Sequence, residues 1–138
     1  MLLVDTSALL AGYDGSDEHH EACLRFFNRD ERRLLSPFAL AELDYLLLKA
    51  RGGAGERVML NDVARGVFEL ASFDSHDVGD AMRVVEHYHD LGIGLADASI
   101  VVLAERYKCL DLLTLDQRHF RAISGPGGRP FRIRPFDD

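Results

Sequence analysis

The alternation of short apolar runs with helical patterns predicts an α/β fold, a mostly parallel central sheet flanked by helices in a sandwich. The first four residues are apolar on both faces, as a buried central strand of a parallel sheet would be. Short strand-like runs follow at 33–35, 68–71 and 112–115. An aspartate follows the first and the last of these four runs directly, at Asp5 and Asp116.

The helices that should separate these strands have recognisable boundaries. The first is expected from Thr6 to Leu10, with Gly12 and the polar residues after it as the break, and the second from about 20 to 28. Ser36 followed by Pro37 predicts a helix start, because Ser is a preferred cap and Pro is preferred at the first helical position. That helix should reach about residue 50, where Gly52 and the glycine after it end it.

The second half of the chain continues the alternation. Helices are expected over about 55–65, from 74 or 75 to about 90, and from 95 to about 107. A short helix or turn at 117–123, a loop at 124–128 and an edge strand at 131–134 complete the pattern. The chain has no evident repeat, linker or low-complexity tract, so we expect a single domain over residues 1–138.

The net charge of −7 restricts how the protein could bind nucleic acid. Phosphate neutralisation supplies most of the affinity of nucleic-acid binders, so an acidic nuclease needs recruited cations, a local basic patch, or both. A late group of arginines would form such a patch or be plain surface charges: Arg118, Arg121, Arg129, Arg132 and Arg134. An acidic protein also suits a basic protein partner.

The amino-acid composition and the N-terminal residues indicate the cellular compartment of the protein. No run approaches the roughly 20 apolar residues of a membrane span, and the N-terminus lacks the pattern of a signal peptide. Cys23 and Cys109 are too few for a disulfide framework. We therefore expect two core cysteines in a cytoplasmic protein without membrane contact.

The acids suggest the chemistry. The carboxyl ends of parallel strands lie on one sheet edge, where open α/β sheets place their ligands, so Asp5 and Asp116 should converge. Glu42 and Asp97 are set inside otherwise apolar helical patterns. Four carboxylates at one edge would repel each other unless a hard divalent cation lay among them. A metal-dependent phosphodiester hydrolase is the hypothesis that follows.

Each acid also has a structural explanation. Asp5 and Asp116 could cap short helices, and Asp97 falls in a first turn, where the helix dipole favours an anion. The helix around Glu42 is apolar nearly all round, which predicts that Glu42 is buried, although an exposed acid on a helix edge is the alternative. The pattern of four is more specific than any one of them.

The histidines and glycines fit other sites poorly. The pairs at 19–20 and 87–89 cannot face one ion from a helix, and no cysteine cluster supports a zinc site. The glycine-rich stretches lack a phosphate-loop context, and no GxSxG elbow is present. His119 could act as a general base, although a single histidine after a strand is more often structural.

Four segments resemble the motifs of PIN domains, and their order and spacing resemble the VapC toxins of bacterial toxin–antitoxin pairs in particular. These are LVDTSAL at 3–9, SP at 36–37 leading to AEL at 41–43, LADA at 95–98 and LTLDQRHF at 113–120. The resemblance covers essentially the whole chain. It implies a PIN-like three-layer sandwich.

The resemblance also implies an activity and partners: an Mg²⁺- or Mn²⁺-dependent endoribonuclease, held inactive by a VapB-type antitoxin, usually dimeric and found in a larger complex with that antitoxin. It implies one set of acids that bind the metal and perform catalysis: Asp5, Glu42, Asp97 and Asp116. The resemblance also implies hydroxyls near them, from Thr6 or Ser7 and from Thr114. Arg118 and Arg121 follow Asp116 closely in the sequence, so they should lie near the metal and contact substrate phosphates. Some relatives carry a further acid where this chain has Gly94 and Ser99, so one or two metals remain open.

Two alternatives remain. A catalytically silent PIN-like module would act through protein contacts, and metal binding separates it from the enzyme. A CheY-like phospho-receiver also places acids at strand ends, but it would need an acidic pair near the first strand and a lysine after the last, and Lys108 is misplaced for that.

Overall fold

Five short strands form one parallel sheet in the computed structural model, which describes residues 1–137. The spatial order is β3-β2-β1-β4-β5, and every adjacent pair of these strands is parallel. The predicted α/β fold is confirmed, and its mostly parallel sheet is parallel throughout. The strands are β1 (Leu2–Val4), β2 (Arg33–Leu35), β3 (Glu69–Leu70), β4 (Asp111–Leu113) and β5 (Arg132–Arg134).

Helices connect these strands. They are α1 (Thr6–Tyr13), α2 (His20–Phe27), α3 (Pro37–Ala64), α4 (Ser75–His87), α5 (Leu95–Tyr107) and α6 (Gln117–Ala122). Short 3₁₀ turns lie at His89–Leu91 and Pro126–Gly128. Within the described residues, none of these helices has both the length and the apolar character needed to cross a membrane.

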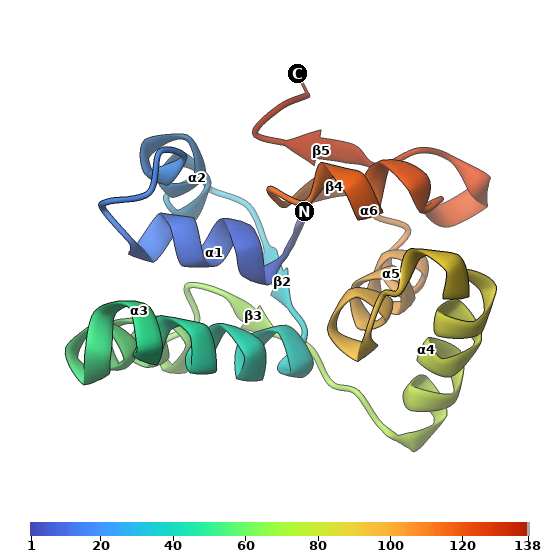
Figure 1. Ribbon diagram of the computed structural model, residues 1–138, viewed down its shortest axis with the longest axis horizontal. Coiled ribbons are helices and arrows are strands. Elements are labelled where there is room, and N and C mark those ends of the chain that lie inside the picture. The colour runs from blue at the N-terminus through green and yellow to red at the C-terminus, as the bar shows by residue number, and fades with distance from the viewer. Residues whose placement is uncertain (138) are drawn as a thin grey trace.

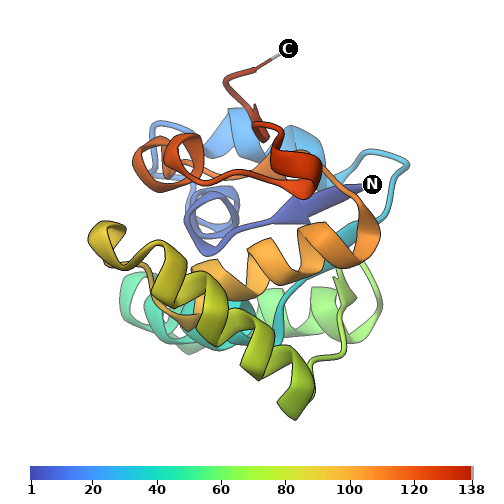
Figure 2. The same cartoon turned by 90° about the vertical axis from the view of Figure 1, so that its right-hand side faces the viewer.

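The side chains of β1 show how the layers are held together. Leu2 and Val4 pack into one core cluster with residues of α1, α2 and α3, whereas Leu3, which points to the opposite face, packs into a second cluster with residues of α5 and α6. Figure 1 shows α1 to α3 on one side of the sheet and α4 and α5 on the other, and Figure 2 views the molecule from the α4–α5 side. The molecule is therefore a three-layer sandwich.

Two glycines do not end helices in the way the sequence indicated. Gly12 lies inside α1, and a Cβ there would come within 2.2 Å of the Phe27 ring, so this glycine permits the close packing of α1 on α2. Gly52 has φ 70° and ψ −174°, a conformation that redirects the chain, and helix resumes directly after it. The expected helices at 37–50 and 55–65 are thus two segments of the kinked α3.

Other boundaries differ by a few residues. β4 ends at Leu113 rather than Leu115, and the buried Thr114 that follows it donates its hydroxyl proton to Asp5 at the end of β1. β3 contains only two residues, both exposed, at one edge of the sheet. β5 forms the other edge, as predicted. Cys23 and Cys109 are free and buried, and burial raises the pKa of the Cys23 thiol to about 11.

Candidate active site

Asp5 occupies the junction of β1 and α1, and its carboxylate binds side-chain hydroxyls instead of capping the helix. It is the N-cap residue of α1, yet its side chain makes no capping hydrogen bond. Instead its Oδ2 accepts hydrogen bonds from Ser7 Oγ at 2.8 Å and from Thr114 Oγ1 at 2.6 Å. The capping alternative therefore does not explain this aspartate.

The two hydroxyls that bind Asp5 are themselves fixed by backbone groups. Ser7 Oγ accepts from the Leu115 N–H at 3.0 Å, and Thr114 Oγ1 accepts from the Asp116 N–H at 3.0 Å. Each hydroxyl has one proton, and both donate it to Asp5. This network ties the end of β1 to the segment after β4 and brings Asp5 close to Asp116.

Asp116 serves both roles that the sequence left open. As the N-cap of α6 its Oδ1 accepts from the His119 N–H at 3.1 Å, while its Oδ2 lies 2.8 Å from the His119 imidazole Nδ1. One carboxylate oxygen therefore caps the helix and the other belongs to a side-chain cluster.

Asp97 lies in the first turn of α5, as predicted, and its side chain is only 21% exposed. The pKa of its carboxyl is raised to about 6, mainly by burial and to a smaller extent by the negative charges of the neighbouring Asp5 and Asp116. His119 Nδ1, 3.6 Å from Asp97 Oδ2, acts in the opposite direction. Burial also raises the pKa of Asp5. The site is therefore short of positive charge.

Glu42 reaches the same site from α3, but it is exposed rather than buried. The expectation of burial was wrong, because α3 does not pack on all faces: Tyr45 is 62% exposed and Leu48 is 44% exposed. Glu42 is nevertheless close enough to raise the pKa of Asp97.

The four predicted acids meet in one pocket of about 340 Å³ at the carboxyl ends of β1 and β4. Its walls come from α1, α3, α5 and the start of α6, and they consist of Asp5, Thr6, Ser7, Leu10, Glu42, Leu46, Asp97, Asp116 and His119. Carboxylate oxygens are the ligands that Mg²⁺ prefers. The donor set and the raised pKa values of Asp5 and Asp97 both fit a hard divalent cation.

Comparison with known proteins identifies the fold family. Residues 2–126 match the PIN domain. The chain belongs to the PIN-domain family. This membership removes the phospho-receiver alternative, and it confirms the resemblance seen in the four sequence motifs.

One curated relative found by sequence is Ribonuclease VapC26 of Mycobacterium tuberculosis (strain ATCC 25618 / H37Rv), 41% identical over 97% of this chain and 100% of the relative. This PIN-domain chain is therefore a homologue of the VapC ribonuclease toxins, which are hydrolases. Among solved structures, VapC20 of M. tuberculosis, a toxin that cleaves the sarcin–ricin loop, superimposes with a TM-score of 0.76 at 17% identity, covering 84% of this chain and 90% of that one. VapBC2 of Rickettsia felis, bound to a DNA fragment from its promoter, gives 0.67 at 16% identity, over 96% and 97%.

The other residues predicted to belong to the site of this PIN domain, a threonine and several arginines, do not all lie at the acidic pocket. The Thr6 hydroxyl donates to the Ala39 carbonyl, at 3.3 Å, and is buried. Arg118 is exposed on α6. The Arg121 guanidinium is held by Asp137, at 2.8 and 3.0 Å, and by Gln117, and it does not line the acidic pocket. The late arginines do not gather as one free patch, since Arg132 and Arg134 pair with Asp111.

His119 is the residue that sequence analysis undervalued. It lies three positions after Asp116, so one turn of α6 returns its ring to the acids. Asp97, Asp116 and His119 each offer one ligand atom, and these atoms lie within 4.8 Å of one another. The spacing DxxH at a helix start was the available signal.

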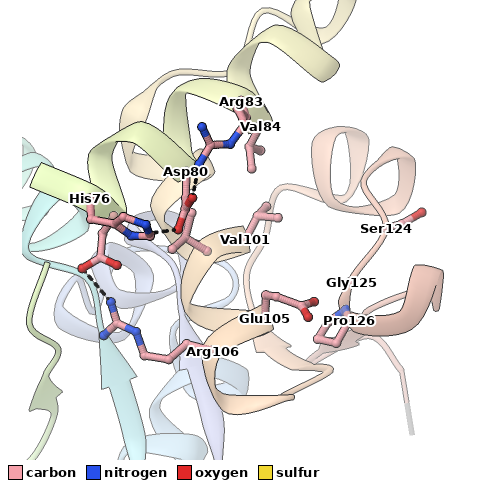
Figure 3. Close-up of a pocket in the computed structure, with 12 residues that line it drawn as sticks. His76, Asp80, Arg83, Val84, Val101, Glu105, Arg106, Ser124, Gly125 and Pro126 are labelled. Atoms are coloured by element: carbon pink, nitrogen blue, oxygen red, sulfur yellow. Dashed lines mark hydrogen bonds and ion pairs between the residues drawn. The ribbon is translucent and has the colours of Figure 1, made fainter. Parts of the chain in front are cut away.

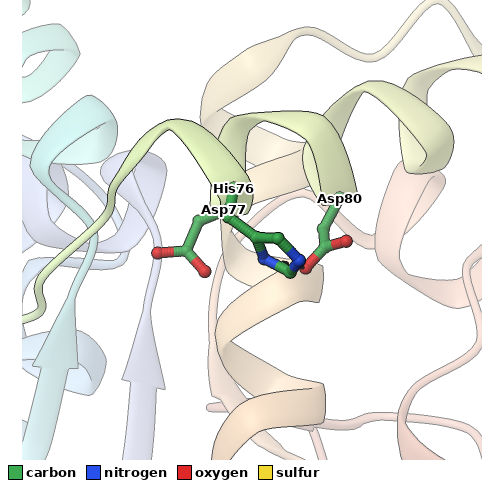
Figure 4. Close-up of side chains that lie close together, drawn as sticks. All are labelled: His76, Asp77 and Asp80. Atoms are coloured by element: carbon green, nitrogen blue, oxygen red, sulfur yellow. Dashed lines mark ion pairs between the residues drawn. The ribbon is translucent and has the colours of Figure 1, made fainter.

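A larger cavity, of about 550 Å³, lies away from these acids between α4, α5 and the loop at 124–126 (Figure 3). It contains a second cluster with metal-ligand spacing: His76, Asp77 and Asp80, all on α4 (Figure 4). These acids already have partners, because Asp77 pairs with Arg106 at 3.0 Å and Asp80 pairs with Arg83, while the His76 side chain is 82% exposed. We therefore favour the smaller pocket as the functional site, because its carboxylate charge is not neutralised, although the other cavity is larger.

Proposed function

We propose that this protein is the endoribonuclease toxin of a toxin–antitoxin pair, and that it hydrolyses RNA with Mg²⁺ or Mn²⁺ held by Asp5, Glu42, Asp97 and Asp116. The observation that carries this proposal is the convergence of four acids from four separate elements in one pocket, with the pKa of Asp97 raised to about 6. Such an arrangement is unfavourable without a cation and is typical of a metal site.

The acids and hydroxyls of the chain then have separate tasks. The bound ion would activate a water and stabilise charge on the scissile phosphate. Asp5 is the most rigidly placed ligand, because two hydroxyl donors fix its carboxylate and only 4% of the residue is exposed. The exposed Glu42 lies at the open side of the pocket, where the RNA backbone would enter. Ser7 and Thr114 act by positioning Asp5.

Hydrolysis of this type leaves a 5′-phosphate and does not use the RNA 2′-hydroxyl as the nucleophile. The decisive experiment is cleavage of total RNA by purified protein with Mg²⁺ or Mn²⁺, followed by mapping of the new ends, using Asp5→Asn as the inactive variant. Asn keeps the shape of Asp and its ability to precede a helix, but it lacks the charge that the ion needs.

Asp80→Asn is the matched control, since Asp80 belongs to the other acid cluster. We expect Asp5→Asn to stay folded by circular dichroism, to lose RNA cleavage and to lose growth arrest on expression, while Asp80→Asn keeps both. Wild-type cleavage by folded Asp5→Asn would refute the proposed site. Absence of metal binding and cleavage in the wild type would favour the silent PIN-like module.

For the substrate, we propose that Arg118 contacts RNA phosphates, because it is exposed on the helix that follows Asp116. A phosphate contact by Arg121 is the weaker part of this proposal, since Asp137 already holds its guanidinium. Arg118→Ala should flatten the slope of log affinity against log salt by about one, and Arg121→Ala should change it less. Equal slopes in the wild type and both variants would make these arginines plain surface charges.

For partners, we propose neutralisation by a VapB-type antitoxin and assembly as a homodimer within a larger toxin–antitoxin complex. The R. felis relative was crystallised as a VapBC complex, and this chain exposes apolar side chains on the helix that carries Glu42, at Tyr45 and Leu48. Co-expression of the cognate antitoxin should relieve growth arrest. Light scattering on the purified toxin should give twice the chain mass, and a monomer mass at all concentrations would contradict the dimer.

A further inference from the structure

The His119 imidazole faces two carboxylates of the acidic pocket, those of Asp97 and Asp116, and the significance of these contacts rests on the proposed metal site. We propose that His119 is a nitrogen ligand of the divalent ion in the acidic pocket, and that it makes the pocket favour a transition ion such as Mn²⁺ over Mg²⁺.

The distances around the imidazole match neighbouring ligands of one ion. His119 Nδ1 lies 2.8 Å from Asp116 Oδ2 and 3.6 Å from Asp97 Oδ2, and the ligand atoms of the three residues lie within 4.8 Å of one another. In octahedral coordination with bonds of about 2.1 Å, adjacent ligand atoms are about 3.0 Å apart and opposite ones about 4.2 Å apart. Both measured spacings fall close to this range.

The position of the ring is determined by the fold. The His119 N–H is bound by the capping oxygen of Asp116, and the next residue, Phe120, is buried in the core under β5. The His119 side chain is only 21% exposed and lines the pocket. The His76 side chain, in the other cluster, is 82% exposed, and its ring lies beside Asp80 (Figure 4). Of these two histidines, His119 is the one whose ring is largely buried beside the carboxylates.

The chemistry of the donor gives the selectivity. Mg²⁺ binds oxygen ligands and retains its waters, whereas imidazole nitrogen binds first-row transition ions more readily. Replacing one oxygen donor by Nδ1 should therefore raise the affinity for Mn²⁺ and leave that for Mg²⁺ nearly unchanged. We expect Mn²⁺ to bind the wild type roughly tenfold more tightly than Mg²⁺.

A positioning role alone makes a different prediction. If His119 only donated a hydrogen bond that orients Asp116, its loss would weaken both ions to the same degree. His119→Asn separates the two roles, because the Asn amide N–H can occupy the place of Nδ1–H and still donate to Asp116, but it offers no nitrogen lone pair.

The direct test is pulsed electron paramagnetic resonance on Mn²⁺ bound to the wild-type protein. The spectrum should show the ¹⁴N coupling of a coordinated imidazole, and ¹⁵N-histidine labelling should change it. His76→Asn, the matched control from the second cluster, should retain the coupling, and His119→Asn should lose it. Titration with free-Mn²⁺ detection, and Mg²⁺ competition, should show about a tenfold loss for Mn²⁺ and less than about twofold for Mg²⁺ in His119→Asn.

Failure of this inference can be told apart from failure of the proposed function. Mn²⁺ that binds the wild type without nitrogen coupling, and is lost in Asp97→Asn, leaves the acidic metal site intact and overturns the role of His119. Loss of coupling in His76→Asn would place the ion in the other cluster and overturn it as well. No Mn²⁺ or Mg²⁺ binding in the wild type would refute the metal site itself. The wild-type spectrum decides even if His119→Asn does not fold.

Discussion

At the scale of single residues, the hydrogen bonds to Asp5 explain why two hydroxyls accompany the acids. Thr114 is fully buried and donates to Asp5 at 2.6 Å, whereas the Thr6 hydroxyl donates to a neutral backbone carbonyl at 3.3 Å. Loss of a donor to a buried carboxylate costs more than loss of a bond between neutral groups. The two threonines therefore form a matched pair for measurement.

We predict that Thr114→Val lowers the free energy of unfolding by about 1.5–3 kcal/mol and Thr6→Val by about 0.5–1.5 kcal/mol. Val keeps the shape of Thr and removes only the hydroxyl. Urea denaturation at neutral pH measures both. Equal losses in the two variants would mean that the Asp5 carboxylate does not depend on Thr114.

The pKa of Asp97 predicts how stability changes with pH. Its folded-state value of about 6 is above the ordinary value of 3.8, so the folded metal-free protein binds a proton that the unfolded chain releases. The stability of the metal-free protein should therefore rise as pH falls from 7 through 6 toward 4. Asp97→Asn should reduce this rise, leaving the part that comes from Asp5, and should be more stable than the wild type at pH 7, by up to about 3 kcal/mol.

Asp137 provides a control of opposite sign. Arg121 holds the pKa of its carboxyl down to about 2, so its contribution to stability is present above the ordinary pKa and is lost as pH falls toward 2. Asp137→Asn should thus be less stable than the wild type at pH 7. Thermal melts between pH 2 and 8, in chelator, test both signs, the Asp97 effect above pH 4 and the Asp137 effect below it. A wild-type curve that declines from pH 7 to 5 as steeply as that of Asp97→Asn would contradict the Asp97 shift.

At the scale of elements, the kink in α3 depends on one backbone conformation. Gly52 has φ 70° and ψ −174°, a region essentially restricted to glycine, and a Cβ there would meet nothing within 4 Å. The cost of a side chain would therefore be conformational only. Gly79 in α4 is also free of neighbours within 4 Å, but it does not have a positive φ.

We predict that Gly52→Ala lowers the free energy of unfolding by about 1–3 kcal/mol, while Gly79→Ala raises it by about 0.5–1 kcal/mol through helix propensity. Chemical denaturation gives both values. A neutral Gly52→Ala would show that the two segments of α3 can be joined without this conformation.

At the scale of the whole molecule, the acidic pocket joins three layers that the chain visits at different times. Asp5 follows β1, Glu42 lies on α3 on one face of the sheet, and Asp97 lies on α5 on the other. A ligand that binds all of them should stabilise the folded molecule as a unit, because the unfolded chain has no such site.

We predict that Mg²⁺ or Mn²⁺ raises the melting temperature by about 9 °C, corresponding to about 2.7 kcal/mol at a concentration 100-fold above its Kd. The shift should vanish in the double variant Asp5→Asn/Asp97→Asn. Differential scanning calorimetry at constant ionic strength is the measurement. An equal shift in the wild type and the double variant would mean that the ion binds elsewhere.

The local chemistry of the chain was sufficient to predict most of the fold. Apolar runs of strand length, the Ser36-Pro37 helix start and the turn residues specify the elements because these preferences act within a few residues. Convergence of Asp5 and Asp116 also followed, since parallel strands place their carboxyl ends on one edge. What these preferences could not indicate was the exposure of Glu42, because exposure depends on what packs against α3.

Tertiary structure decided the remaining details, for one physical reason: they depend on contacts between segments far apart in the chain. Gly12 lies within a helix, because the Phe27 ring occupies the space that a side chain at this position would fill. Thr114 reaches Asp5 because β4 and β1 are neighbours in the sheet. His119 becomes a member of the site only when α5 brings Asp97 beside it. The sequence by itself determined the secondary-structure elements and identified the acids. Packing across the sheet determined which side chains lie close enough to interact electrostatically.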